Sequence, residues 1–66
     1  MDLKLMFLDC FDSEFKDKNY KIFRFVDLQS LSIISGTDLE GEFEPYKVYN
    51  CHVEWKHNKF KVVAAH

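Results

Sequence analysis

Three lysines near the C-terminus carry the clearest chemical signal in this chain. Lys56, Lys59 and Lys61 follow one another closely. Lys59 and Lys61 are two residues apart, so on a β-strand both side chains point to the same face. Lysines beside exposed aromatic rings bind single-stranded nucleic acid, because the lysines attract phosphates and the bases stack on the rings. The three lysines are therefore candidate phosphate contacts.

Aromatic rings, the other half of such a site, make up 17% of the chain. In the apolar run from Tyr20 to Leu28, burial of the face that carries Ile22 and Val26 would turn Phe23 and Phe25 outward. Exposed rings on a small barrel can stack against bases. Phe23 and Phe25 are therefore candidate stacking residues. The alternative is that they lie under a loop or in a dimer interface.

The charges are divided along the chain, although the net charge is only -2. Residues 27–45 hold five acids and no base, whereas residues 46–66 have a net charge of +3. Tyr46, at the edge of the acidic segment, is a further candidate stacking residue. The acidic residues 38–44 are interpreted as a solvated loop, as an arm that screens the basic face, or as a mimic of nucleic acid. The basic residues also have an alternative interpretation, in which they are solubilising charges on the edge of a strand.

Catalytic and metal-binding patterns are poor, and the sequence predicts neither an enzyme nor a cofactor. Cys51 and His52 are adjacent, so on a strand they point to opposite faces. No pair of Cys or His residues has zinc-ligand spacing, and there is no glycine-rich phosphate loop. Cys10 and Cys51 are interpreted as free thiols in apolar positions.

The expected location is the cytoplasm. The residues from Met1 to Phe11 lack the basic start of a secretory signal. No apolar run approaches the ~18–20 residues that span a bilayer, so no contact with a membrane is expected.

Five short apolar runs must position these side chains. Apolar residues recur along them with a period of two, which predicts β-strands. Tyr49, Cys51, Val53 and Trp55 alternate with polar residues, as in a half-buried strand. His57-Asn58 then forms a tight turn into a last strand. The polar residues 12–19 are expected to form a loop, and residues 37–44 a loop or one short turn. The five runs are Leu3 to Phe11, Tyr20 to Leu28, Leu31 to Ser35, Lys47 to Lys56 and Lys59 to Val63.

These strands predict a single all-β domain over residues 1–66. A small five-stranded barrel similar to an oligonucleotide-binding (OB) fold has this strand number and a break between its third and fourth strands. Closing the sheet also removes edges that invite aggregation. An SH3-like barrel and an open antiparallel meander are the alternatives.

The C-terminal third resembles the closing strands of small single-stranded-DNA-binding proteins from phages and conjugative elements. The similarity covers a Pro45-Tyr46 lead into the alternating strand to Trp55, and a last strand from Lys59 to Val63. It implies an OB-type barrel, often dimeric, that binds strands with little sequence preference. It also implies stacking by Tyr46 and the outward rings of the second strand, with phosphate contacts from Lys59 and Lys61.

Two functions follow from these observations. The first is a non-catalytic accessory protein that binds single-stranded DNA or RNA, from a phage or other mobile element. The second is a small β-barrel that binds a protein partner or forms a homodimer and has no role with nucleic acid. Aromatic residues and the basic C-terminal segment favour the first, and the net negative charge and the small size favour the second.

Overall fold

The computed structural model describes residues 1–66 and contains five strands and no helix. It thus has no helix that is long and apolar enough to cross a membrane. The strands are β1 (Asp2–Phe15), β2 (Lys18–Val26), β3 (Ile33–Thr37), β4 (Val48–Lys56) and β5 (Lys59–Ala65).

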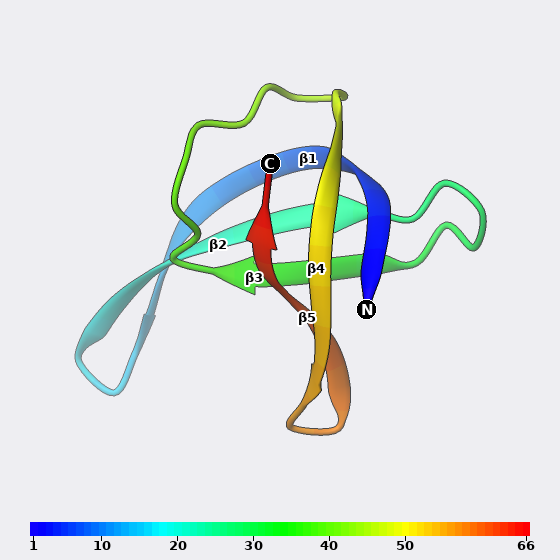
Figure 1. The fold of residues 1–66 in the computed structure, drawn as a ribbon. Coiled ribbons are helices and arrows are strands. Elements are labelled where there is room, and N and C mark those ends of the chain that lie inside the picture. The colour runs from blue at the N-terminus through cyan, green and yellow to red at the C-terminus, as the bar shows by residue number, and fades with distance from the viewer.

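The strands close into a barrel in the order β1-β2-β3-β5-β4 (Figure 1). β1 pairs with both β2 and β4, so the sheet returns on itself and its first strand has no open edge within the barrel. β3 and β5 run parallel, and all other pairs are antiparallel. The prediction of a small five-stranded, OB-like barrel is confirmed, and the open meander is excluded because the barrel closes.

The barrel interior is filled by alternate residues of all five strands. A cluster of eight buried side chains forms the core: Leu5, Phe7, Phe23, Phe25, Ile34, Cys51, Val53 and Val62. Phe43, from the loop between β3 and β4, packs on this cluster, with its ring centroid 5.5 Å from that of Phe7 and 5.8 Å from that of Phe25. The predicted break between the third and fourth strands is therefore confirmed as a loop, and one of its rings contributes to the core.

The prediction that Phe23 and Phe25 point outward is wrong. Their exposed fractions are 5% and 0%, so both rings belong to the core. The reason lies with Arg24, whose guanidinium makes two hydrogen bonds to the carboxylate of Asp9, at 2.7 and 2.5 Å. A charged pair stays at the surface because burial of an ion is costly. The face of β2 that carries Arg24 is therefore the outer face.

The polar residues 12–19 also differ from the prediction, because they form paired strands and not a loop. β1 and β2 pair as far as Phe15 and Lys18, joined by a turn at Lys16 and Asp17. Both turn residues have positive φ, 51° and 62°, as a two-residue hairpin turn requires. The hairpin extends away from the barrel (Figure 1), so its residues can be polar and still be paired.

The predicted hairpin of the last two strands is confirmed. His57 and Asn58 have φ values of 53° and 64°, and Lys56 is the cross-strand partner of Lys59.

Gly36 allows β5 to lie close to β3, because a Cβ atom at this position would lie 2.6 Å from the backbone oxygen of Val62. Of the two free thiols, Cys51 is buried as expected, whereas Cys10 is exposed and does not occupy an apolar interior position.

Candidate nucleic-acid interface

Trp55 and Phe60 form an exposed aromatic pair on the β4–β5 hairpin. They are cross-strand partners, and their ring centroids lie 4.8 Å apart at an interplanar angle of 77°. Trp55 continues the alternation of Cys51 and Val53, which are each 1% exposed, yet 61% of Trp55 is exposed. The hairpin extends beyond the barrel (Figure 1), so the inward-facing row of β4 continues into solvent. Two large rings are thus presented where no core remains to cover them.

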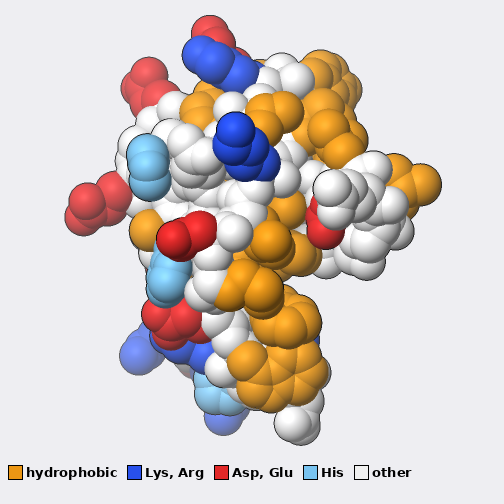
Figure 2. Space-filling view, turned by 45° about the vertical axis from the view of Figure 1, so that its right-hand side comes forward, with side chains coloured by type: hydrophobic (Ala, Val, Ile, Leu, Met, Phe, Trp, Pro, Cys, Tyr) orange, Lys and Arg blue, Asp and Glu red, His pale blue; other side chains and the backbone are white.

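The aromatic pair lines a surface groove of about 650 Å³. Figure 2 shows hydrophobic side chains in a band that runs from the projecting hairpin up into this hollowed face. Residues of the hairpin, of β2 and β3, of the loop 27–32 and of the N-terminus line the groove: Met1, Leu3, Ile22, Asp27, Ser30, Ser32, Ile33, Ile34, Ser35, Thr37, Trp55, Lys59, Phe60 and Lys61.

The outer face of β2 and β3 contributes small and aliphatic side chains to the groove. Ile22 pairs with Thr37, and Arg24 pairs with Ser35 one step further along the same face. Short side chains leave the sheet surface open, so that a flat group can lie close to the backbone. Hydroxyl groups of Ser35 and Thr37 also offer both hydrogen-bond donors and acceptors.

Two of the three predicted lysines lie in this groove. Lys59 and Lys61 line it beside Phe60, and Lys61 is the parallel partner of Ser35 on β3. Neither ammonium group makes an ion pair within the protein. Two unpaired cations beside two exposed rings match the combination expected of a single-strand binding surface.

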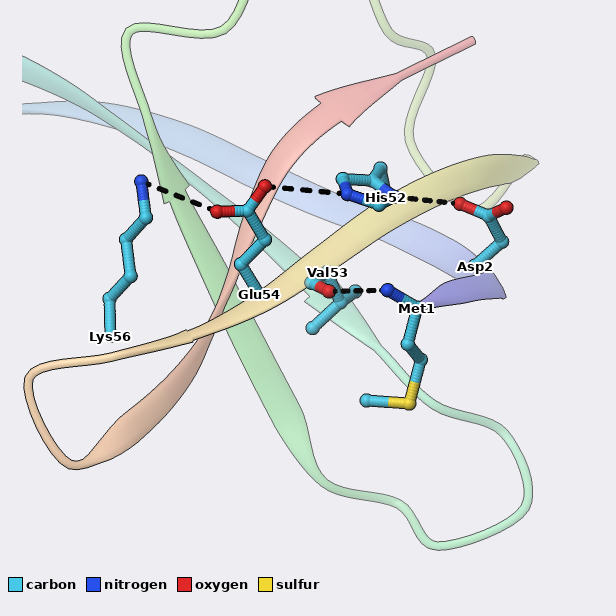
Figure 3. Close-up of polar contacts among 6 residues, drawn as sticks. All are labelled: Met1, Asp2, His52, Val53, Glu54 and Lys56. Carbon is cyan, nitrogen blue, oxygen red and sulfur yellow. Dashed lines mark hydrogen bonds and ion pairs between the residues drawn. The ribbon is translucent and has the colours of Figure 1, made fainter.

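Lys56 belongs to a different surface, on the outside of β4. Its ammonium lies 3.6 Å from a carboxylate oxygen of Glu54, whose other oxygen lies 3.4 Å from Nε2 of His52. The ring of His52 in turn forms a hydrogen bond of 2.8 Å to Asp2 (Figure 3), and this bond holds the pKa of Asp2 below its usual value. The positive charge of Lys56 is thus partly balanced by a neighbouring acid.

The first residue of the chain ties β1 to β4 beside this row of charges. The amino group of Met1 donates a hydrogen bond of 2.9 Å to the backbone oxygen of Val53, and the Val53 N–H donates to the oxygen of Met1. Figure 3 shows the Met1 side chain pointing away from Asp2 and His52. It lines the same groove as Trp55 and adds to the apolar lining.

The remaining predicted stacking residues do not join the groove. Phe23 and Phe25 are buried, so their faces are not open to a ligand. Tyr46 is 74% exposed but precedes β4, whereas the hairpin follows it. The nine residues of β4 span about 30 Å, so Tyr46 lies at the other end of the molecule from Lys59.

Sequence reasoning missed Trp55 and Phe60 as site residues because both fit the pattern of a buried strand face. One signal in the sequence was available. The two rings stand directly before and after the Lys56–Lys59 turn, and residues next to a hairpin turn are the first to lie outside a small barrel. Lys59 and Lys61, by contrast, were predicted to share one face of the last strand, and both line the groove.

No three His, Cys, Asp or Glu side chains gather where they could hold a metal ion. Burial raises the pKa of the Cys51 thiol to about 11, so this group is protonated and a poor nucleophile at neutral pH. The features of the groove suit binding.

No protein-family model, curated protein or solved structure matches the chain. The interpretation of the groove therefore depends on its own residues and geometry.

Proposed function

We propose that the protein binds single-stranded nucleic acid, without catalysis, in the groove beside the β4–β5 hairpin. One observation carries the proposal: the exposed Trp55–Phe60 pair and the unpaired Lys59 and Lys61 line the same groove. Each base stacked on a ring contributes about 1–3 kcal/mol to binding. The lysines attract the phosphates that follow those bases, and flexible single strands suit a short groove of this kind.

The overall negative charge makes the lysines important. With a net charge of -2, the protein as a whole does not attract a polyanion. Attraction must come from a local concentration of positive charge, and in the groove Lys59 and Lys61 supply it. Lys47 and Lys56, the other lysines of residues 46–66, are each paired with an acid outside the groove. We therefore expect modest affinity that falls as salt rises, because salt screens the phosphate contacts. A cytoplasmic accessory role in a phage or other mobile element belongs to the same proposal.

The proposal is tested by fluorescence anisotropy with labelled single-stranded DNA and RNA at low and physiological salt. We expect binding that weakens with salt, and further weakening in a Lys59→Gln, Lys61→Gln double variant. A Lys4→Gln, Lys18→Gln double variant is the matched control, because it removes the same charge from positions outside the groove. Absence of binding at low salt would refute the proposal, as would equal losses in the two double variants.

A protein-binding or homodimer function is the second candidate, and exposed aliphatic residues favour it. Leu28, Leu31 and Ile33 are 54%, 73% and 50% exposed, and all lie in or directly after the loop 27–32 that borders the groove. Exposed apolar patches often mark protein contacts. Sedimentation of the wild type and of a Leu31→Ser variant tests this function. A dimer that the substitution dissociates supports it, and a monomer in both cases opposes self-association.

A further inference from the structure

The groove has two chemically different sides. Lys59 and Lys61 come from β5, whereas Asp27, Ser30 and Ser32 come from the loop 27–32. The hairpin and this loop both project from the barrel at different points around it (Figure 1). A nucleic acid strand also has two sides, the phosphates and the base edges. The placement of charge therefore indicates how a strand would lie in the groove.

Asp27 is held in place by its own loop. Its backbone N–H donates to the oxygen of Ser32 at 3.0 Å, and its backbone oxygen accepts from Leu31 at 2.7 Å. One carboxylate oxygen accepts a hydrogen bond of 2.9 Å from the backbone N–H of Gln29. Leu31 has a φ of 60°, and β3 begins two residues later, at Ile33. The hydrogen bonds of the Asp27 backbone and of one carboxylate oxygen thus hold this side chain in place at the groove.

No cation balances this carboxylate. Asp27 takes part in no ion pair, and only one of its two oxygens has a hydrogen-bond partner. A free carboxylate repels phosphate, so the backbone of a bound strand is expected on the side of Lys59 and Lys61. The same carboxylate accepts hydrogen bonds from N–H groups, which single-stranded nucleic acid offers on the base edges.

Guanine is the base that suits this acceptor best. Its N1–H and its 2-amino group are adjacent donors with no acceptor between them. Thymine and uracil present one N–H between two carbonyl oxygens, and those oxygens repel a carboxylate. We propose that Asp27 accepts hydrogen bonds from a base edge and gives the groove a preference for guanine over thymine or uracil. This inference rests on the proposed function.

The test compares a short oligothymidylate with the same oligonucleotide carrying one central guanine. Binding to wild type is measured by anisotropy at one low salt concentration. A well-formed contact to a base edge discriminates by about tenfold in affinity. We expect the guanine oligonucleotide to bind more tightly by about that factor. Replacing the guanine by inosine, which lacks the 2-amino group, should remove part of the preference.

An Asp27→Asn variant tests the residue itself. The amide oxygen of Asn can still accept the N–H of Gln29, so the loop keeps its closing bond. We expect this variant to lose the guanine preference and to bind oligothymidylate at least as well as wild type. Lys61→Gln is the matched control, and it should weaken both oligonucleotides equally.

The outcomes separate this inference from the proposed function. If neither oligonucleotide binds at low salt, the proposed function fails. If wild type binds both equally, or if Asp27→Asn keeps the full guanine preference, the role of Asp27 is overturned while single-strand binding stands. The inosine comparison uses only wild-type protein, so it tests the inference even if the variant does not fold.

Discussion

Two groups of aromatic residues in this barrel have similar chemistry and opposite surroundings. Phe7, Phe23, Phe25 and Phe43 contact one another in the interior, with centroid distances between 5.3 and 6.3 Å. Trp55 and Phe60 contact each other at 4.8 Å but lie on a projecting hairpin, 61% and 44% exposed. The interior group holds a small barrel together, whereas the hairpin pair adds little to the core. In a chain of only 66 residues, two large rings that are exposed beside unpaired lysines suggest a surface that binds a ligand.

The largest expected difference between the two groups is in stability. Phe25→Ala removes a fully buried ring and should lower the free energy of unfolding by about 3–5 kcal/mol, close to the whole stability expected of a chain this small. Phe60→Ala makes the same chemical change on the hairpin and should lower it by about 1 kcal/mol, the strength of one aromatic pair. Urea denaturation of both variants tests the comparison, which fails if the two losses are similar.

Binding should show the opposite order. Trp55→Ala should weaken single-strand binding by about 1–3 kcal/mol while leaving the protein folded, because the variant has one stacking surface fewer. Tyr46→Ala is the matched control, since Tyr46 is also open to solvent but lies outside the groove. Anisotropy titrations of the two variants measure the difference. Equal loss of affinity in both would mean that the binding surface extends beyond the hairpin groove.

A smaller effect is expected from the lysines and would appear mainly in the salt dependence. Removing one lysine–phosphate interaction should reduce the slope of log affinity against log salt by about 0.7 for a single strand. Lys61→Gln should therefore bind less tightly than wild type at low salt and approach it at high salt. Lys56→Gln should change the slope less, because that ammonium lies 3.6 Å from Glu54 on another face. A larger change from Lys56→Gln would contradict the placement of the groove.

The smallest expected effect concerns Asp9 and Arg24, on the outer face that leads toward the groove. The hydrogen bonds from Arg24 hold the pKa of Asp9 below its usual value. The pair therefore stabilises the fold at pH values above the pKa of an unfolded Asp, about 3.9, and the stabilisation is lost as pH falls through the lower folded-state pKa. Asp9→Asn should melt slightly earlier than wild type at neutral pH. Thermal melts should converge at acid pH, and a constant difference would exclude the ion pair as its cause.

Period-two patterns are enough to predict much of the fold. The five strands, the His57-Asn58 turn and the loop before β4 all follow from local alternation and turn residues. Which face of β2 points inward does not follow from alternation, because both faces of this strand carry apolar residues. The decisive residue is Arg24, which in the sequence looks like an interruption of one apolar face. Its partner Asp9 is distant in sequence, so only the pairing of β1 with β2 shows that their common face is outside.

An irregularity in β1 explains a second failure of the simple alternation. The register shifts between Phe7 and Asp9, where Leu8 is the extra residue of a bulge. Phe7 is buried before the bulge, and Phe11 is 47% exposed beyond it. The sequence around Leu8 contains no glycine or proline to signal this change. Strand length is also underestimated at residues 12–15, since polar residues in a projecting hairpin look the same as a loop.

Only some of the residues that line the groove can be predicted from the sequence, because local alternation does not show where the barrel ends. Lys59 and Lys61 are found because their spacing and strand are clear. Trp55 and Phe60 are missed because alternation identifies the face of a residue and not the point at which the barrel ends. That point depends on how β5 crosses to β3, a pairing between strands that the sequence does not display.

The most direct test of the groove uses the intrinsic fluorescence of Trp55, the sole tryptophan of the chain. Because Trp55 lies in the groove, a base stacked on it should quench its emission. We predict saturable quenching by unlabelled single-stranded DNA or RNA at low salt, reversed by added salt. Binding seen by anisotropy with no change in Trp55 emission would place the ligand elsewhere and contradict the account.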